Sequence, residues 1–215
     1  MNNQNIKIDL EPFLENQKIT PGKKKVLLSS IELFSQYGFN GVSTANIARE
    51  AEVSEATIFK HFKNKRGLLL AIITPIIEHC IPQYDDIFTR NIENQNNNLR
   101  NLVHFIVTDR MQFLKQNKEI VSIFLSELVI NEEVRNLLIT TIEQKNKQNS
   151  QKILHAFQNT NELSPDINFQ SLLRIIMGQL LIYFVQINLF EVKTINQSQI
   201  ESQIYRTLKK ERKWT

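Results

Sequence analysis

Apolar residues recur along most of this chain at intervals of three and four, which is the spacing of one face of an α-helix. Between Pro21 and Tyr37 one such face collects the small and apolar positions Val26, Leu27, Ser30, Leu33, Phe34 and Tyr37. Proline is favoured in the first turn of a helix and glycine directly after the last, so Pro21 and Gly38 mark the two ends. The pattern therefore predicts a helix from about Pro21 to Tyr37.

The same period predicts helices in the rest of the chain, and no alternating run of β-branched residues indicates a strand. Four of the five glycines lie at or before Gly67, which leaves the later chain almost free of helix breakers. Pro75 and Pro82 are expected to kink or break the apolar stretch from Leu68 to Ile81. The expected helices cover approximately residues 44–51, 54–62, 64–80, 99–116, 119–130, 132–159, 166–190 and 197–211. The prediction is an all-α fold of about nine helices.

Two of these helices, residues 44–51 and 54–62, are short and are separated by only two residues. Two short helices joined by a tight turn and preceded by a longer helix form a helix-turn-helix, whose second helix enters the major groove of DNA. Their shared core is expected from Ile47, Ala48, Ala51, Val53, Ile58 and Phe62. Thr44 and Ser54 lie where N-cap residues belong, and capped helix N-termini can face a phosphate.

The outward side of the second short helix is small or polar enough to enter a groove. It presents Glu55, Ala56, Phe59 and Lys60, and the basic residues His61, Lys63, Lys65 and Arg66 follow as candidate phosphate contacts. Glu55 could accept a hydrogen bond from a cytosine amino group, or it could only cap the helix and repel phosphates. His61 could equally be a surface histidine without a role.

Three stretches of this region resemble the N-terminal domain of TetR-family transcriptional regulators. Residues 25–39 read KVLLSSIELFSQYGF, residues 43–51 read STANIAREA, and residues 53–69 read VSEATIFKHFKNKRGLL. The last stretch is the most specific, with an aromatic residue two positions before His-Phe and then Asn-Lys-X-X-Leu-Leu. The resemblance covers about 50 of the 215 residues. It implies a two-fold dimeric regulator that binds a palindromic operator in double-stranded DNA, a repressor that a small-molecule effector releases.

The resemblance also implies roles for individual residues. Thr44 would touch a phosphate, three side chains of the second short helix would face base edges, and three others would hold the DNA backbone. The base-facing set is Glu55, Ala56 and Lys60, and the backbone set is Thr57, His61 and Lys65. With Ser54 and Phe59, these residues form the candidate DNA-binding site.

Two positions depart from the family pattern. The turn between the short helices usually carries glycine where this chain has Glu52, because the backbone there is left-handed, a conformation that costs a residue with a side chain about 1 kcal/mol. The second short helix usually carries tyrosine where this chain has Phe59, so no phenol can donate to a phosphate. These departures keep an alternative open: a helical small-molecule or lipid-binding protein whose head no longer binds DNA.

The expected division of the chain is an N-terminal arm (1–19), a helix-turn-helix domain (20–80) and a helical effector-binding and dimerisation domain (81–215). The helix at 166–190 is apolar on all sides and therefore needs cover on two of them. A second copy of the chain would supply one cover, as the resemblance implies for the last two helices, although a fully intramolecular core stays possible. The candidate dimer residues are Met177, Gly178, Leu180, Phe184 and Ile204.

The helix at 99–116 carries a row of three residues, His104, Thr108 and Met111, through an apolar surface. In the family such a helix lines a ligand cavity, to which neighbouring helices add aromatic residues such as Phe124. The row could equally be the solvated face of the helix. The apolar surroundings predict a largely apolar effector of unknown identity, with the helix at 64–80 as the lever that carries its effect to the DNA-binding helices.

Composition adds few constraints. The chain has 26 Lys and Arg against 22 Asp and Glu, a net charge of +4, which weakly favours nucleic acid as a partner. Cys80 is the single cysteine, and the four histidines are scattered, so neither a disulfide nor a metal site is expected. No phosphate loop or catalytic motif is present, so neither an enzyme nor a cofactor is expected. No signal peptide is present, and the longest apolar run, Leu68 to Ile73, is too short to span a membrane, which predicts a cytoplasmic protein without a membrane partner.

Overall fold

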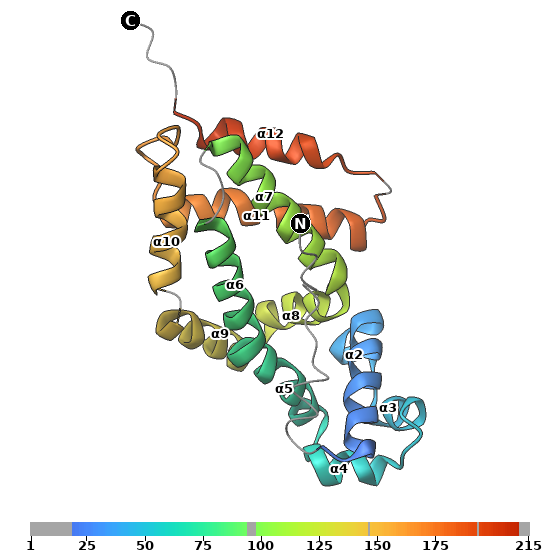
Figure 1. Cartoon of the computed structure of the whole chain (residues 1–215). Helices are drawn as coiled ribbons and strands as arrows, with labels where there is room; N and C mark the ends of the chain where they lie inside the picture. Colours follow the sequence, from blue (N-terminus) through green and yellow to red (C-terminus); the bar gives the residue numbers. More distant parts are fainter. Residues whose placement is uncertain (1–18, 94–97, 146, 193, 211–215) are drawn as a thin grey trace, which may run out of the picture. The chain divides into compact units, whose positions relative to one another are not determined.

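The computed structural model describes residues 19–93, 98–145, 147–192 and 194–210 (Figure 1). Over these residues the fold is all-α, as predicted, and the chain runs from α2 to α12 with no strand beyond an isolated bridge between Leu163 and Lys209. The predicted N-terminal arm lies outside the described residues except for Ile19.

The helices pack into two compact units, each with its own apolar core. The first unit joins the chain up to Gln83 with Asn117–Gln144. It contains α2 (Pro21–Gly41), α3 (Thr44–Glu50), α4 (Glu55–Phe62), α5 (Lys65–Pro75), η1 (Ile76–Cys80), α8 (Lys118–Ile130) and α9 (Glu132–Lys145). The second contains α6 (Ile81–Glu93), α7 (Leu99–Gln116), α10 (Lys147–Gln158), α11 (Phe169–Asn188) and α12 (Gln197–Leu208). Thus α8 and α9, which the sequence assigned to the later domain, pack in the first unit.

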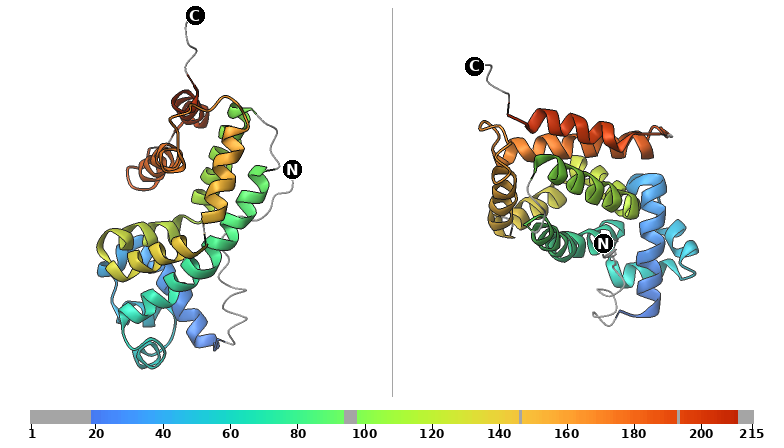
Figure 2. Two further views of the ribbon diagram at one scale, coloured as in Figure 1. Left: turned by 90° about the vertical axis from the view of Figure 1, so that its left-hand side faces the viewer. Right: turned by 45° about the horizontal axis from the view of Figure 1, so that its top comes forward.

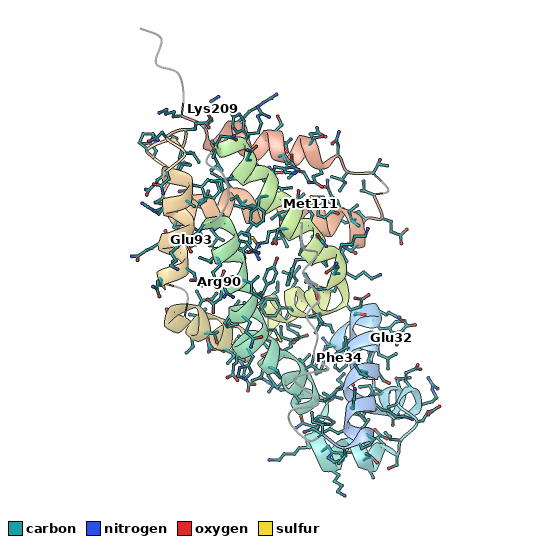
Figure 3. The ribbon with its side chains drawn as sticks, in the orientation of Figure 1. Glu32, Phe34, Arg90, Glu93, Met111 and Lys209 are labelled. Atoms are coloured by element: carbon teal, nitrogen blue, oxygen red, sulfur yellow. The ribbon has the colours of Figure 1, made fainter. Side chains whose placement is uncertain are left out.

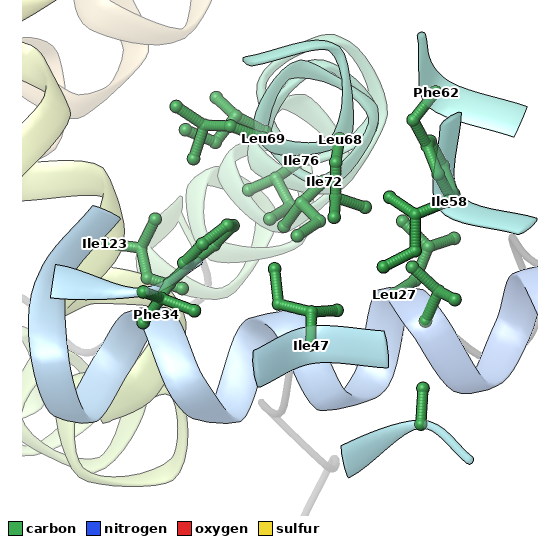
Figure 4. Packing of buried hydrophobic residues seen from close by; sticks show 14 of the residues in the cluster. Leu27, Phe34, Ile47, Ile58, Phe62, Leu68, Leu69, Ile72, Ile76 and Ile123 are labelled. Atoms are coloured by element: carbon green, nitrogen blue, oxygen red, sulfur yellow. The ribbon is translucent and has the colours of Figure 1, made fainter. Parts of the chain in front are cut away.

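The core of the first unit draws side chains from α2, α3, α4, α5 and α8. Figure 4 shows Phe34 of α2 beside Ile123 of α8, and both are almost completely buried. At the other end of the same core Leu27 of α2 lies close to Ile58 of α4 (Figure 4). Burying an aliphatic or aromatic side chain of this size stabilises a fold by about 1.5–3 kcal/mol. The long helix α2 therefore holds the two short helices on one side and α8 on the other.

The chain is helical throughout from Lys65 to Glu93, so its two prolines do not end the helix. Pro75 keeps a helical φ of −61°, and the Ile81 N–H donates to the Ile76 carbonyl five residues earlier, which is a π-helical turn. Because a proline has no N–H to donate, one hydrogen bond of the regular α-helical pattern cannot form near Pro75. The helix continues with a wider π-helical turn instead. The predicted break is therefore a local change in the hydrogen-bond pattern.

Other boundaries differ slightly from those expected. The predicted helix at 132–159 divides into α9 and α10. The predicted helix at 166–190 begins at Phe169, because the Asn168 side chain caps it by accepting from the Ser171 N–H at 2.9 Å. In α2 the left-handed Gly38, with φ of 69°, interrupts the helix where the sequence predicted its end.

Two helical stretches, Lys65–Glu93 and Phe169–Asn188, are long and apolar enough to cross a membrane by length and composition. Polar residues interrupt both stretches, so neither contains an unbroken apolar run long enough to span a membrane. One face of each is packed in a core of this fold, with Leu68 and Ile72 in the first unit and Leu172 and Leu180 in the second. A helix that is packed in a protein core can have the same length and apolar composition as a membrane-spanning helix.

Candidate DNA interface

Helices α3 and α4 are joined by a tight turn that its own backbone closes. The Ala51 N–H donates to the Ile47 carbonyl at 2.9 Å, and the Val53 N–H donates to the Ala48 carbonyl at 3.0 Å. Ile47 and Ile58 are fully buried beneath the turn. With α2 packed before them, α3 and α4 form the predicted helix-turn-helix.

The caps of the two short helices are serines. Ser54 caps α4, as predicted, and accepts from the Thr57 N–H at 3.3 Å. The predicted N-cap Thr44 is instead the first residue of α3, and Ser43 caps that helix in a reciprocal capping box with Asn46. Ser43 and Thr44 are adjacent and both residue types are good caps, so the predicted cap lies one residue after the observed one.

Thr44 and Glu55, both predicted to contact DNA, contact each other. The Thr44 hydroxyl donates a short hydrogen bond to a Glu55 carboxylate oxygen, which links the start of α3 to the start of α4. A carboxylate in the first turn of a helix interacts favourably with the helix dipole. The negative charge of Glu55 also repels a DNA phosphate. While the Thr44 hydroxyl donates to Glu55, it cannot donate to a phosphate.

The exposed residues of α4 include Ala56, Phe59 and Lys60, with Glu55 at the start of the helix, and the opposite face is buried in the core. The Phe59 ring is 47% exposed, which is unusual for an aromatic residue without a partner surface. Within the described chain, Lys60 and its neighbour Lys63 make no ion pair. This face therefore offers an apolar surface and two available cations on a helix narrow enough for a major groove.

Lys65 is committed to the fold rather than free for a phosphate. Its ammonium donates to the carbonyls of Phe39 and Val42, both at 2.8 Å, and lies 4.4 Å from the centre of the Phe39 ring. It thereby fixes the segment between α2 and α3 to the start of α5. Arg66 is likewise engaged, in an ion pair of 3.0 Å with Glu133 of α9.

The turn residue Glu52 has a left-handed backbone, with φ of 54°, as the family pattern predicted. Its carboxylate accepts from the Lys25 ammonium at 2.8 Å. This hydrogen bond and the charge of Lys25 lower the pKa of the Glu52 carboxyl below its ordinary value. Both side chains are exposed, so the ion pair offsets little of the backbone strain.

Replacing Glu52 with glycine should therefore stabilise the protein. Glycine adopts positive φ without steric cost, and we expect the midpoint of thermal unfolding to rise by about 2–4 °C. Differential scanning calorimetry on Glu52→Gly and on Glu50→Gly, in the last turn of α3, makes the comparison. Glu50→Gly should lower the midpoint because glycine weakens a helix. A lower midpoint for Glu52→Gly would show that the ion pair outweighs the strain.

Residues 26–72, which contain these helices, match the family model described as bacterial regulatory proteins, tetR family. Over these residues the chain is similar to TetR-family regulators. Among its relatives, the uncharacterized HTH-type transcriptional regulator YvkB of Bacillus subtilis is 32% identical over 129 residues, 60% of this chain and 63% of YvkB. The probable HTH-type transcriptional regulator YttP of the same organism is 24% identical over 145 residues, 65% of this chain and 66% of YttP. The matched regions span less than two thirds of each relative.

Solved structures of TetR-family proteins share the fold over most of the chain. The fatty acid degradation regulator FadR of Bacillus halodurans matches with a TM-score of 0.62 and 14% identity, covering 87% of this chain and 94% of FadR. The regulator FadR of Bacillus subtilis, solved with stearoyl-CoA, matches with a TM-score of 0.58 and 13% identity, covering 85% of this chain and 95% of that one. At these identities the likeness establishes the fold alone.

The predicted effector-site residues do not form one cluster within a unit. His104 and Thr108 of α7 are exposed and contact α12, where His104 pairs with Glu201 at 3.0 Å and Gln197 donates to Thr108 at 2.7 Å. Met111 lies further along α7 and is half-buried (Figure 3). Phe124 belongs to the first unit and packs against its core. His104 and Thr108 thus match the alternative of a solvated helix face.

Sequence reasoning missed a cluster of aromatic and charged side chains between α6 and α7. The guanidinium of Arg110 lies 3.6 Å from the centre of the Phe88 ring and 4.8 Å from that of Tyr84. The Tyr84 hydroxyl donates a short hydrogen bond to Asp109, and burial raises the pKa of that phenol well above its usual range. Tyr84 and Phe88 lie on α6 whereas Asp109 and Arg110 are adjacent on α7, so no local spacing in the sequence indicated that the four side chains meet. Over the part of the chain that is described, no three metal-ligating side chains gather.

The predicted dimer residues divide between the two faces of α11. Leu180 and Phe184 of α11, and Ile204 of α12, are at most 3% exposed and belong to the core, so they cannot contact a partner in this fold. Met177 and Gly178 are exposed, and Leu173, Leu181 and Ile182 extend the same face. The exposed positions of α12, which lies beside α11 in both views of Figure 2, are polar or basic. The apolar surface of this helix pair is therefore the outer stripe of α11.

Proposed function

We propose that this protein is a sequence-specific DNA-binding transcriptional regulator, a cytoplasmic homodimeric repressor that a small, largely apolar ligand releases from a palindromic operator. The observation that carries the proposal is the exposed face of α4, where Ala56, Phe59 and Lys60 stand on a capped helix of a TetR-type helix-turn-helix. The family match and the names of the relatives support it.

In this proposal α4 lies in the major groove. Lys60 reads a base edge, such as the O6 and N7 acceptors of guanine, and the Phe59 ring contacts an apolar surface such as a thymine methyl group. Lys63 and the capped N-terminus of α4 at Ser54 contact phosphates, with Thr57 and His61 beside them. The carboxylate of Glu55 disfavours any operator that brings a phosphate against it, and this adds to specificity through repulsion.

Two copies of the chain are needed to read a palindrome, with half-sites about 34–36 Å apart. We place the contact between the copies on the outer stripe of α11, which is apolar and uncovered in the single chain. The exposed Arg174 lies among these apolar side chains, and several apolar side chains gathered on one exposed helix face often mark a contact with a partner.

We place effector binding in the helices of the second unit, with the half-buried Met111 of α7 as a candidate contact. The stearoyl-CoA in the structure of Bacillus subtilis FadR is a molecule with a long apolar chain, which supports an apolar effector. Release from DNA requires only that the effector prefer a non-binding conformation by a few kcal/mol. The π-helical turn after Pro75 is the place where the predicted lever can bend.

A DNA-binding titration tests the proposal. Lys60→Ala should weaken binding to the operator, which is sought first in the DNA flanking the protein's own gene, by about 1–3 kcal/mol, which is roughly 5- to 150-fold in affinity. It should also relax base preference at one position of each half-site. The matched control Lys115→Ala removes the same charge from an exposed position on α7 and should leave both unchanged. Fluorescence anisotropy at several salt concentrations measures affinity, and a systematic operator library measures preference. Equal effects of the two variants would show that α4 does not read DNA.

A helical small-molecule or lipid-binding protein whose head no longer binds DNA is the second candidate. It is favoured by the bond between Thr44 and Glu55 and by the commitment of Lys65 to carbonyl groups, since both remove expected phosphate ligands. In the same titration this candidate predicts no salt-dependent binding to any duplex by the wild-type protein.

A further inference from the structure

Side chains from α6 and α7 form a continuous stack in the second unit, and the guanidinium of Arg110 is part of it. Its central carbon lies 3.6 Å from the centre of the Phe88 ring and 4.8 Å from that of the Tyr84 ring. The stack continues through two further rings, with Phe105 at 5.9 Å from Phe88 and Phe113 at 4.4 Å from Tyr84. Cation–π attraction to two rings, in a site that excludes most water, holds the Arg110 charge in a fixed place.

The hydrogen-bond donors of Arg110 are not matched by an acceptor of the chain. Only 18% of its side chain is exposed, yet within the described residues none of its N–H groups donates a hydrogen bond. The nearest anion is Asp109, whose oxygen lies 3.8 Å from Nε and already accepts from the Tyr84 hydroxyl. Polar groups that are mostly withdrawn from water normally find partners, so these donors call for an acceptor from outside the chain.

The charges around Arg110 limit what that acceptor can be. Burial, together with the charges of Asp109 and Asp85, raises the pKa of the Tyr84 phenol, whereas the charge of Arg110 opposes this rise. The phenol therefore stays protonated and keeps the Asp109 oxygen engaged, which leaves the guanidinium to an external ligand. Because two carboxylates already lie close by, a ligand with one negative charge is favoured over a ligand with two.

We infer that Arg110 binds the carboxylate of a singly charged effector, so that the apolar ligand of the proposed function is an amphipathic monocarboxylate. A carboxylate presents two oxygens that fit the N–H fork of arginine. Tyr84, Phe105 and Phe113 are each partly exposed, and Met111 follows Arg110 on α7, so apolar surface for the rest of the molecule lies near the charge. The inference rests on the proposed function, because it names the chemical class of the effector.

Isothermal titration calorimetry on the full chain, without DNA, tests this class. The probes are octanoate, its uncharged counterpart octanamide, and octyl phosphate, which carries about two negative charges at neutral pH. A charge-assisted bidentate pair should make octanoate bind the wild type roughly tenfold or more tightly than octanamide. Equal binding of these two probes, or no binding of octanoate, would overturn the inference. Tighter binding of octyl phosphate would overturn the choice of a carboxylate.

Substitutions connect the preference to Arg110. Arg110→Met should bind octanoate and octanamide equally, and Arg110→Lys, which keeps the charge but not the fork, should lose most of the preference. The matched control Arg90→Met changes an exposed arginine of α6, whose Nε donates to the Asp86 carbonyl at 3.3 Å, and should keep the preference of the wild type. A control variant that loses the preference to the same extent would contradict the role of Arg110.

A measurement on the wild-type protein needs no variant that folds without the Arg110 stack. In a ¹⁵N spectrum of the arginine side chains, octanoate should shift the Nε–Hε signal of Arg110 and leave that of Arg90 in place. An unshifted Arg110 signal at saturating octanoate would overturn the inference.

Operator affinity is measured separately with and without octanoate, by fluorescence anisotropy. If octanoate shifts the Arg110 signal but leaves operator affinity unchanged, the carboxylate site is supported and the proposed release from DNA is contradicted. If the protein binds its operator but not octanoate, the inference fails and the proposed DNA binding stands.

Discussion

Gly67→Ala is expected to lower the free energy of unfolding by about 3 kcal/mol, the upper end of what overpacking usually costs. A Cβ atom at Gly67 would lie 2.1 Å from the Phe62 carbonyl oxygen, far inside van der Waals contact. That oxygen belongs to the backbone at the end of α4, so the clash cannot be relieved by rotating a side chain. Either α4 or the start of α5 has to move.

Chemical denaturation followed by circular dichroism measures this effect. Gly22→Ala is the matched control, because a Cβ there meets no atom within 4 Å and the residue also lies in the first turn of a helix of the first unit. The control should unfold within about 1 kcal/mol of the wild type. If Gly67→Ala unfolds at the same denaturant concentration as the control, the close approach of α4 and α5 is wrong.

Leu180→Arg and Leu181→Arg, adjacent on α11, are expected to fail in different ways. Leu180 is fully buried in the second core, and an unpaired charge there should cost several kcal/mol and unfold the unit. Leu181 is 43% exposed on the outer stripe, and arginine there should leave the fold intact but separate the proposed dimer.

Sedimentation velocity and circular dichroism at micromolar concentration distinguish the two outcomes. Leu181→Arg should sediment as a helical monomer, whereas Leu180→Arg should lose helical signal or precipitate. A wild-type protein that already sediments as a monomer would contradict the proposed dimer. A Leu181→Arg protein that remains dimeric would move the contact to another surface.

Local features of the DNA-binding region were predictable because each has a local cause. Ser54 caps α4 since a serine at that position satisfies the Thr57 N–H, and both lie within one turn. The left-handed conformation of Glu52 was expected from the resemblance to the TetR family, whose turn usually carries glycine at this position. The helix end near Gly38 follows from the freedom of glycine at positive φ.

Features that depend on distant parts of the chain were not predictable in this way. Lys65 looked like a phosphate ligand because its actual acceptors, the carbonyls of Phe39 and Val42, carry no side-chain signal in the sequence. The role of Gly67 appears only when α4 and α5 meet. On α11 the apolar residues surround the helix, so the period could not show that Leu180 faces inward and Met177 outward.

The first unit also has a consequence for how the protein is made. Its core is filled by Ile123 and Val134, which follow the DNA-facing helices by a long stretch of chain. On a ribosome adding about 5–20 residues per second, the roughly 60 residues between Gln83 and Gln144 take about 3–12 s to appear. During that interval α2 to α5 are outside the ribosome with part of their core exposed. A fragment that ends near residue 83 would stay in that condition permanently, so we expect the isolated helix-turn-helix region to be a poor folding unit and an early target for proteases.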